Sequence, residues 1–566
     1  MRNKGSGYGL PTRIFVGIKL PVVAFLFCMV FLLGCAYALA PPVSALATGS
    51  VTSPPAHICG NASILTSPYT TQPYGSVAIN SSDIGTMIQN SPAYTTFWLE
   101  SGTYYTSIAS LKNGDTLIGA PNVIIDGEHI YGDALSAPAG QTNITLEYLT
   151  VENFGAPISP SSFDDVDQNF NPFWTYKYDT FINDQGAAIG FDYGGVIEYD
   201  CLTQNGGYGF NSGGGVNTGG VNGNIPGFLS TNTTSTVADA EKMPPIKLEH
   251  DEISFNNVDN IDRTPFACGC SGGGKLNNDF NVTISDNYMH NNYGPGIWSD
   301  GNNDEENFSN NYIMNNWGIG IDYELGVNAK IWHNTLIGNE QVDGTSSAGF
   351  MGPAIYISNA GGSRVAGNLY YEFNITNNTF LDNYGGIALW EDGSRFCGNS
   401  RPGNSCNQDA FAVGLNSSTC TVSAIENATP GNLLWWACMW RTQNVTVANN
   451  YFLFNFTQSE CGLGLAPVHI GCGIMGLFSG VVGEPYGGAA GYGAEDNITY
   501  YQNNHFNNNT YVGNWLFSPY GQGQDANFSM WQGKTAWSPD EGGALEGQHV
   551  NQDQNSVIIG QYSLDG

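Results

Sequence analysis

The sequence has little positive charge. Its 566 residues include 16 Lys and Arg against 49 Asp and Glu, for a formal net charge of −33 at pH 7. Binding to nucleic-acid phosphates needs a basic face, so the composition excludes nucleic acid as a natural partner. Charged residues of both signs make up only 11% of the chain, so the acidity reflects missing Lys and Arg, unlike a halophile's carboxylate-coated surface.

The chain also lacks helical periodicity. Its apolar runs are short, alternate with polar residues as at 282–284 and 321–323, and are separated by Gly and Asn. Such runs predict strands of about three to five residues. With 74 Gly and 13% aromatic residues, the sequence indicates a folded, turn-rich protein, because disordered chains contain few aromatics.

One long apolar run is present, from Leu20 to Ala40, preceded by Arg13 and Lys19. It is long enough to span a bilayer. Small residues at its end suit signal cleavage and residues 32–35 resemble a lipobox, so a cleaved signal, a lipid anchor and an uncleaved membrane anchor all stay open. Each of them exports the remainder, so we expect a secreted or cell-surface protein that touches a membrane only through this segment.

Cysteine usage agrees with export. Ten of the twelve cysteines follow the apolar run, and an even number suits disulfides in an oxidising compartment. Cys268 and Cys270 lack a second ligand pair at zinc-site spacing, so a disulfide role is favoured for them. The locally plausible pairs are Cys397 with Cys406, Cys420 with Cys438, and Cys461 with Cys472. Glycosylation sequons recur, but strand patterning explains many of them.

An internal repeat is the strongest signal. An Asn is followed two residues later by a large apolar residue, and a second Asn follows five residues after the first. Asn287 lies 24 residues before Asn311, which lies 23 residues before Asn334. This is the period of a solenoid. The six copies pair Asn287 with Asn292, Asn311 with Asn316, Asn334 with Asn339, Asn378 with Asn383, Asn450 with Asn455, and Asn504 with Asn509.

Three short strands and three turns per period describe one coil of a parallel β-helix, whose coils stack about 4.8 Å apart. Asn tolerates left-handed backbone angles, and its side chain can hydrogen-bond from coil to coil, so the repeated Asn are expected to be structural. We therefore expect Asn287, Asn311 and Asn334 to stack in one column. The apolar residues that follow them, Met289 and Ile313 among them, should fill a shared core.

Residues 97–104, 111–120 and 123–127 look like the opening coils of the pectin-lyase-like superfamily. Residues 386–397 and 508–513 resemble secreted β-helix repeat proteins common in actinobacteria, which are known mostly by their fold. The resemblance implies an all-β chain folded as a single-stranded right-handed parallel β-helix. The resemblance supports the fold and the export of the protein strongly, and it supports a particular reaction only weakly.

Four segments follow. They are a signal or anchor at 1–40, an N-terminal extension at 41–74, the β-helix domain at 75–535 and a C-terminal tail at 536–566. Breaks in the period predict insertions at 156–190, 206–245, 339–353 and 394–443. On a solenoid, such loops wall a groove on one face. We expect a monomer.

Two aligned strands indicate where a ligand would bind. If the Ile side of residues 297–300 and 321–324 is the core, Trp298 lies over Asp322 and Asp300 over Glu324 on the outer face. Aromatic rings beside carboxylates suit a sugar polymer, and an ordinary solvated face is the alternative. The candidate catalytic residues are Asp300, Asp322, Glu324 and Glu391, and the candidate substrate-binding residues are Trp298, Tyr356, Trp390 and His333.

The distance between two carboxylates indicates which glycosidase mechanism they could support. Asp300 and Glu324, one coil or about 5 Å apart, would suit a retaining glycosidase, whereas Glu324 and Glu391, about 10 Å apart, would be nearer an inverting one. Polygalacturonase-like and pectate-lyase-like motifs are only partly present, at 299–301 and 263–265. The scarcity of Lys and Arg favours neutral over acidic glycans.

No resident cofactor or metal is expected, with Ca²⁺ as the alternative. Asp300, Asn302, Asp304 and Glu306 alternate as in a calcium loop, but Glu305 stands where an EF-hand has glycine. His333, beside a repeated Asn, is either an acid or base or a surface residue.

The sequence thus predicts an exported β-helix protein that binds and cleaves an extracellular polysaccharide, as a glycoside hydrolase in preference to a polysaccharide lyase. The rival hypothesis is a non-catalytic adhesin or envelope glycoprotein that uses the β-helix as a rigid binding rod. An acid pair focused in a walled groove favours the enzyme. Carboxylates spread evenly around the coils favour the adhesin. Self-repulsion at net charge −33 predicts a stability maximum on the acid side of neutrality.

Overall fold

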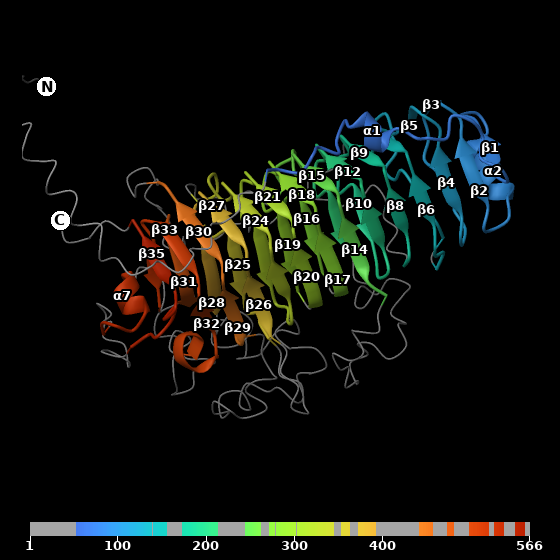
Figure 1. Cartoon of the computed structure of the whole chain (residues 1–566). Helices are drawn as coiled ribbons and strands as arrows, with labels where there is room; N and C mark the ends of the chain where they lie inside the picture. Colours follow the sequence, from blue (N-terminus) through green and yellow to red (C-terminus); the bar gives the residue numbers. More distant parts are fainter. Residues whose placement is uncertain are drawn as a thin grey trace, which may run out of the picture. The chain divides into compact units, whose positions relative to one another are not determined.

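The computed structural model describes residues 53–138, 140–155, 172–212, 244–261, 271–277, 279–301, 303–344, 352–362, 372–391, 441–456, 472–479, 497–519, 526–536 and 549–560. In this part of the chain the strands form three parallel sheets, of thirteen, thirteen and nine strands (Figure 1). No helix among the described residues is both long and apolar enough to cross a membrane.

Sheet 1 consists, in spatial order, of β1 (Val77–Ile79), β2 (Thr96–Leu99), β4 (Thr116–Gly119), β6 (Thr145–Glu147), β8 (Thr175–Lys177), β11 (Val196–Glu198), β14 (Ile246–Glu249), β17 (Phe280–Ser285), β20 (Asp304–Ser309), β23 (Lys330–Trp332), β26 (Phe373–Thr376), β29 (Val445–Ala448) and β32 (His505–Asn507).

Sheet 2 consists of β3 (Gly102–Tyr104), β5 (Val123–Asp126), β7 (Thr150–Glu152), β9 (Thr180–Ile182), β12 (Cys201–Thr203), β15 (Glu252–Ser254), β18 (Tyr288–His290), β21 (Tyr312–Met314), β24 (Thr335–Ile337), β27 (Thr379–Leu381), β30 (Tyr451–Phe454), β33 (Thr510–Gly513) and β35 (Val557–Ile559).

Sheet 3 consists of β10 (Ile189–Phe191), β13 (Phe210–Ser212), β16 (Gly274–Leu276), β19 (Ile297–Asp300), β22 (Ile321–Glu324), β25 (Ile355–Ser358), β28 (Ile387–Glu391), β31 (Ile474–Ser479) and β34 (Leu516–Ser518). The helices of the described residues are short: α1 (Ala62–Leu65), α2 (Ile84–Asn90), α7 (Phe528–Trp531) and the π-helix η4 (Asn497–Tyr501).

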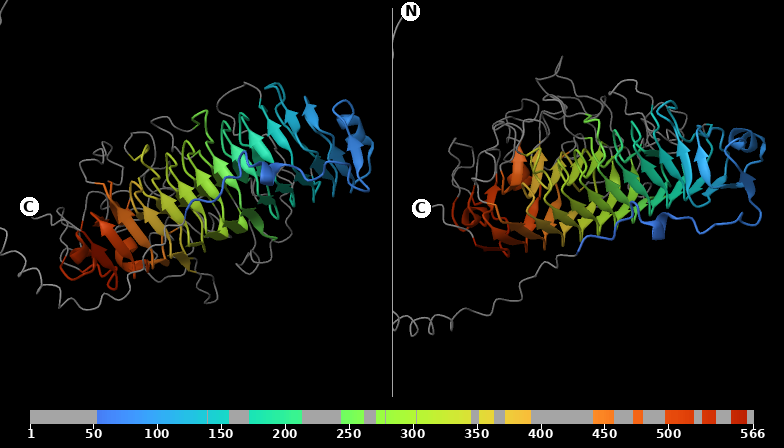
Figure 2. Two further views of the ribbon diagram at one scale, coloured as in Figure 1. Left: turned by 45° about the horizontal axis from the view of Figure 1, so that its top comes forward. Right: turned by 90° about the horizontal axis from the view of Figure 1, so that it is seen from above.

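From β8 to β34, successive strands join the three sheets in turn, so three strands make one coil, whereas the described strands before β8 belong to sheets 1 and 2 alone. Each strand pairs in parallel with its counterpart one coil later: β17 with β20, β18 with β21, and β19 with β22. The two views of Figure 2 show this stacking obliquely and from above. The expected parallel β-helix is therefore confirmed.

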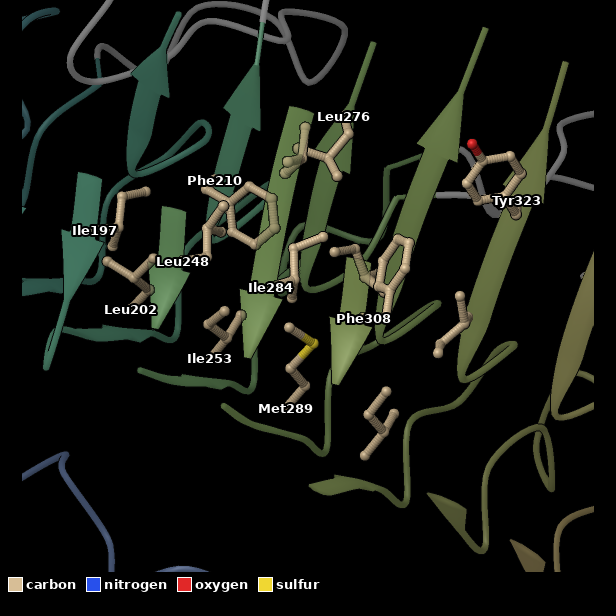
Figure 3. Packing of buried hydrophobic residues seen from close by; sticks show 14 of the residues in the cluster. Ile197, Leu202, Phe210, Leu248, Ile253, Leu276, Ile284, Met289, Phe308 and Tyr323 are labelled. Atoms are coloured by element: carbon tan, nitrogen blue, oxygen red, sulfur yellow. The ribbon is translucent and has the colours of Figure 1, made fainter. Parts of the chain in front are cut away.

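One continuous core lies between the sheets. Met289, Ile313 and Leu336 are completely buried in it, as expected from the repeat. Figure 3 shows Ile284 from β17 and Met289 from β18 pointing into the same interior. Strand alternation explains this, because every second side chain of each strand faces inward.

The expected column of Asn residues stands at the turn between sheets 1 and 2, and we name it the first ladder. The backbone N–H of Asn287 donates to Oδ1 of Asn311, at 3.1 Å, and that of Asn311 donates to Oδ1 of Asn334, at 2.9 Å. Each Asn side chain also donates to the previous coil, as Asn311 Nδ2 does to the Ile284 carbonyl at 2.8 Å. Positive φ angles just before the ladder, such as 56° at Asn310, tighten the turn.

The second Asn of most repeats forms a second ladder between sheets 2 and 3, where Asn292 donates to Asn316 and Asn316 to Asn339. Two repeats depart from the expectation. Asn455 is exposed and bonds to Asp382, so the second ladder does not include it. Asn450 donates to Asn509, so Asn509 continues the first ladder where Asn504 was expected. Asn509 fits the repeat as well, because the core residue Tyr511 follows it two positions later.

The expected boundaries also shift. β35 pairs with β33 in sheet 2, so the β-helix extends past residue 535 into the expected tail. The expected insertion at 156–190 contains the strands β8 and β9 and the start of β10. Part of the N-terminal extension, residues 53–61, reaches β12 and β15, where a disulfide joins Cys59 to Cys201. We name residues 53–61 the N-terminal arm.

Candidate functional site

The outer face of sheet 3 has the register that the sequence predicts. Trp298 of β19 pairs with Asp322 of β22, and Asp300 pairs with Glu324. Ile297, Ile321 and Tyr323 belong to the core, so the alternate side chains lie outside the coil. The face thus combines an indole ring with carboxylates from adjacent coils.

A lysine completes this cluster. Lys275 of β16 pairs with Trp298 in register, and its Nζ lies 2.9 Å from Asp300 Oδ2 and 3.7 Å from the centre of a Trp298 ring. The ammonium group therefore makes an ion pair and a cation–π contact at once. The side chains of Lys275 and Asp300 are 18% and 20% exposed, so water reaches both. We name Lys275, Trp298 and Asp300 the sheet 3 site.

The expectation of a solvent-facing acidic patch is wrong for the rest of this face. Asp322 is 1% exposed and Glu324 is 3% exposed. Trp298, at 8%, packs with Ala187 and Tyr208 in a small apolar cluster outside the core. Tyr356 and Trp390 belong to another such cluster, with Phe478, and are also buried. The face is a partly covered second layer, open chiefly at the ion pair.

Glu391 does not extend the outer carboxylate column. It lies inside β28, on the same side as Ile387 and Leu389 by strand alternation, and Trp390 holds the outward position that aligns with Ser358. Glu391 Oε2 accepts the Thr442 backbone N–H at 2.7 Å. The expected pair of Glu324 and Glu391 on one face is therefore not formed.

His333 is also separate from the sheet 3 site. It stands in the turn between β23 and β24, with a φ of 55°, where the first ladder runs. Its exposed ring lies 4.6 Å from that of Trp332. Sheet 3 contributes none of these contacts, so His333 is not brought together with the other candidates.

Buried acids lie inside the coil beneath the site. Ser299 donates to Glu306 Oε2 at 2.7 Å and accepts from Asn303 Nδ2 at 2.6 Å. Burial raises the pKa of Glu306 well above its usual value, and it raises that of Asp279 to about 7. Both carboxyls are enclosed, so they support the strand positions from below.

The residues of the expected calcium loop do not face one another. Asp300 lies on the outer face, paired with Lys275, whereas Glu306 bonds to Ser299 inside the coil. Asp304 accepts from Asn328 Nδ2 at 2.7 Å, and Asn302 lies outside the described residues. Elsewhere, on sheet 2, the described residues contain one His and carboxylate cluster that could hold a metal ion: His57, Glu252 and His290.

Sequence reasoning missed Lys275. Alternation in residues 274–276 would have placed its side chain outside the coil, and every lysine is informative in a chain with so few basic residues. Trp298 lies one period of 23 residues after Lys275, so the spacing could have found this pairing, but the repeat was not extended back to residues 274–276. The arm residues Cys59 and His57 were missed for another reason, since they contact coils far along the chain.

Comparison with known proteins agrees with the fold. A family model described as a right handed beta helix region matches residues 244–370. The A-module of the Azotobacter vinelandii mannuronan C-5 epimerase AlgE6 is 14% identical with a TM-score of 0.35, over 56% of this chain and 87% of its own. A mannuronic acid specific polysaccharide family 6 lyase from human gut microbiota is 12% identical with a TM-score of 0.40, over 78% of this chain and 81% of its own.

No curated protein matches the chain in sequence. Both structural likenesses are weak in identity and in TM-score, so the fold rests on the family match and on the sheets. The family match covers the coils around β14 to β25, where the two ladders are regular. With the three parallel sheets, it identifies the chain as a right-handed parallel β-helix protein.

Proposed function

We propose that this protein is exported and that it binds and modifies an extracellular polysaccharide at the sheet 3 site. The observation that carries the proposal is the ion pair of Lys275 and Asp300 over the ring of Trp298. Trp298 is buried and holds the Lys275 ammonium against its ring, so a bound sugar would meet the ammonium and the carboxylate. A carboxylate beside an ammonium can exchange protons with a bound sugar. The Cys59–Cys201 disulfide supports an oxidising compartment.

Lys275 adds acidic polysaccharides to the candidate substrates. The low content of Lys and Arg favoured neutral glycans, but the sheet 3 site contains a lysine that water reaches. An ammonium group would bind a uronate carboxylate directly. Uronate-containing polymers therefore join neutral glycans as candidates.

The experiment is a screen of the purified protein against neutral and uronate-containing polysaccharides. New reducing ends without unsaturation indicate a hydrolase, and unsaturated ends indicate a lyase. Asp300→Asn and Lys275→Met should each reduce turnover about 100-fold or more, as expected for loss of an acid–base group. Trp298→Ala should mainly raise the KM.

A matched control exists on sheet 1. Lys177 Nζ lies 2.6 Å from Glu198 Oε2, and water reaches both side chains, which are 33% and 27% exposed. Lys177→Met should therefore leave turnover unchanged. Full activity of both site variants on a confirmed substrate would move the chemistry elsewhere. If binding occurs without any product and only Trp298→Ala abolishes it, the protein is an adhesin.

A further inference from the structure

A second cluster lies on the outer face of sheet 2. Ile253 and Met289 point into the core. Their neighbours in the strands, Glu252 of β15 and His290 of β18, therefore face outward. His57 of the N-terminal arm reaches the same point, and the disulfide two residues later fixes the arm to β12. The three side chains thus come from segments far apart in the sequence.

Glu252 holds the cluster together. Its Oε2 accepts the backbone N–H groups of Ile58 and Cys59, at 2.7 and 3.0 Å. Its Oε1 lies 3.0 Å from His57 Nδ1 and 3.0 Å from His290 Nε2. Burial alone would raise the pKa of Glu252, but the hydrogen bonds from the two imidazoles and the arm backbone outweigh it and lower the pKa to about 2. Glu252 is therefore an ionised carboxylate with one oxygen shared by two imidazoles.

The second nitrogen of His290 has a partner of its own. Nδ1 of His290 lies 2.8 Å from Oδ1 of Asn291, so Nδ1 can donate a hydrogen there and leave Nε2 to bind a cation beside the Glu252 carboxylate. A ring that donates through one nitrogen and binds metal through the other is the usual state of a ligating histidine.

We propose that His57 Nδ1, Glu252 Oε1 and His290 Nε2 bind one divalent transition-metal ion, with Zn²⁺ as the best fit. The three ligand atoms all lie within 4.8 Å of one another. Two imidazoles and a carboxylate form a set that zinc binds at about 2.0–2.2 Å, and atoms 3.0 Å apart reach those distances with small movements. Hard cations prefer oxygen ligands, which disfavours Ca²⁺ and Mg²⁺ here.

The surroundings suit a metal with an open coordination position. A groove of about 890 Å³ runs beside the three ligands, and its lining includes Tyr148, Gln204 and Tyr288. Glu252 and His290 are buried, whereas the His57 side chain is 64% exposed. An ion bound here would link the N-terminal arm to β15 and β18, beside the Cys59–Cys201 crosslink. This site is on a different sheet from the proposed polysaccharide site and does not depend on it.

The test is calorimetric titration of the chelator-treated full chain with ZnCl₂ at neutral pH. One Zn²⁺ should bind per chain. His57→Ala and His290→Ala should each weaken binding about 10-fold or more, as loss of a ligand requires. His250→Ala is the matched control, because His250 is an exposed histidine that stacks on Tyr199 outside the cluster. It should bind Zn²⁺ like the unmodified chain.

Two outcomes would overturn the proposal. Absence of Zn²⁺ binding would mean that His57 and His290 only hydrogen-bond to Glu252. Binding that survives both ligand substitutions would place the ion elsewhere. If His290→Ala does not fold, the exposed His57 still decides the question, because its removal leaves the buried residues in place.

Discussion

The first ladder has two halves that make the same backbone contact with different side chains. Towards the C-terminus it consists of Asn, as at Asn287 and Asn311. In the coils before them the same position is Asp: the backbone N–H of Asp179 donates to Asp200 Oδ1 at 2.6 Å, and that of Asp200 donates to Asp251 Oδ1 at 2.8 Å. Asp251 in turn donates to Asn287 Oδ1, so the two halves are continuous.

The two halves of the ladder differ in the second polar atom of the side chain, which is Nδ2 in Asn and Oδ2 in Asp. Asn287 Nδ2 donates to the Leu248 carbonyl at 2.8 Å, whereas Oδ2 of Asp200 and of Asp251 has no hydrogen-bond partner among the described residues. An ionised carboxylate has no donor, but a protonated one offers an O–H in place of the amide N–H. Burial raises the pKa of both Asp residues well above the usual value, and the carboxyls of Asp179 and Asp251 raise that of Asp200 further. The Asp half therefore suits protonated acids.

This difference sets the pH dependence. A folded carboxyl with a raised pKa holds a proton that the unfolded chain releases, so its stabilisation is complete below the unfolded pKa, near 3.8. It is lost as the pH rises through the folded pKa. The Asn half does not titrate. The Asp half of the ladder should therefore weaken towards neutral pH, whereas the ladder contacts of the Asn half should not.

The largest expected effect comes from placing an Asp in the Asn half. Asn311→Asp should destabilise the fold at pH 7 by roughly 3 kcal/mol, because a buried carboxylate would replace an amide that donates to two coils. Acidification to pH 4 should restore most of the loss. Thermal melts at both pH values measure it, with Asn310→Asp as the control at an exposed neighbour. Equal losses at both pH values would show that protonation does not rescue the ladder.

The converse substitution should have a smaller effect of opposite sign. Asp200→Asn converts the central acid of the Asp half to the amide used elsewhere, so stability at pH 7 should rise by about 2 kcal/mol. At pH 4 the gain should disappear, because the protonated acid already supplies the donor. Denaturant unfolding at the two pH values tests this, and Asp83→Asn is the exposed control. A loss of stability at pH 7 would mean that the ionised form is the native one.

Much of this architecture could be predicted from sequence because its contacts repeat at a short period. Asn287 and Asn311 are 24 residues apart, so their stacking follows from spacing alone. The same regularity gave the pairing of Trp298 with Asp322 and placed Ile313 in the core. Alternation along each strand then predicted which side chains point away from the core.

Contacts that cross an insertion could not be predicted. Cys59 meets Cys201 at a separation of 142 residues, and His57 meets Glu252 at a separation of 195 residues. The burial of side chains on the outer face of sheet 3 also could not be predicted. A strand pattern places Tyr356 outside the coil, but it does not show that a second layer of side chains encloses this residue. The acidic residues in the ladder were overlooked because the repeat was defined by Asn, although Asp makes the same backbone contact.

The smallest expected effect comes from an acid that titrates in the opposite sense next to the Asp half. Glu252 follows Asp251 directly, but it faces outward and has a pKa lowered to about 2. Its stabilisation is therefore complete above its usual pKa, near 4.5, and is lost as the pH falls towards 2. With the Asp half, this predicts a stability maximum of the unmodified chain on the acid side of neutrality. Glu252→Gln should lower stability at pH 5 by about 1 kcal/mol, because Gln retains an acceptor for the arm but loses the charge.

Thermal melts between pH 2 and pH 8, with chelator present, distinguish the stabilisation that is lost at low pH from the stabilisation that is lost towards neutral pH. In the Glu252→Gln variant the acid limb of the profile should flatten, while the decline towards neutral pH should stay. Asp200→Asn should flatten the neutral side instead. If the Glu252→Gln variant changed the neutral side, or if the unmodified chain were most stable above pH 7, then the inward-facing and outward-facing acids would not titrate in opposite senses. The ladder comparison would then fail as an account of pH dependence.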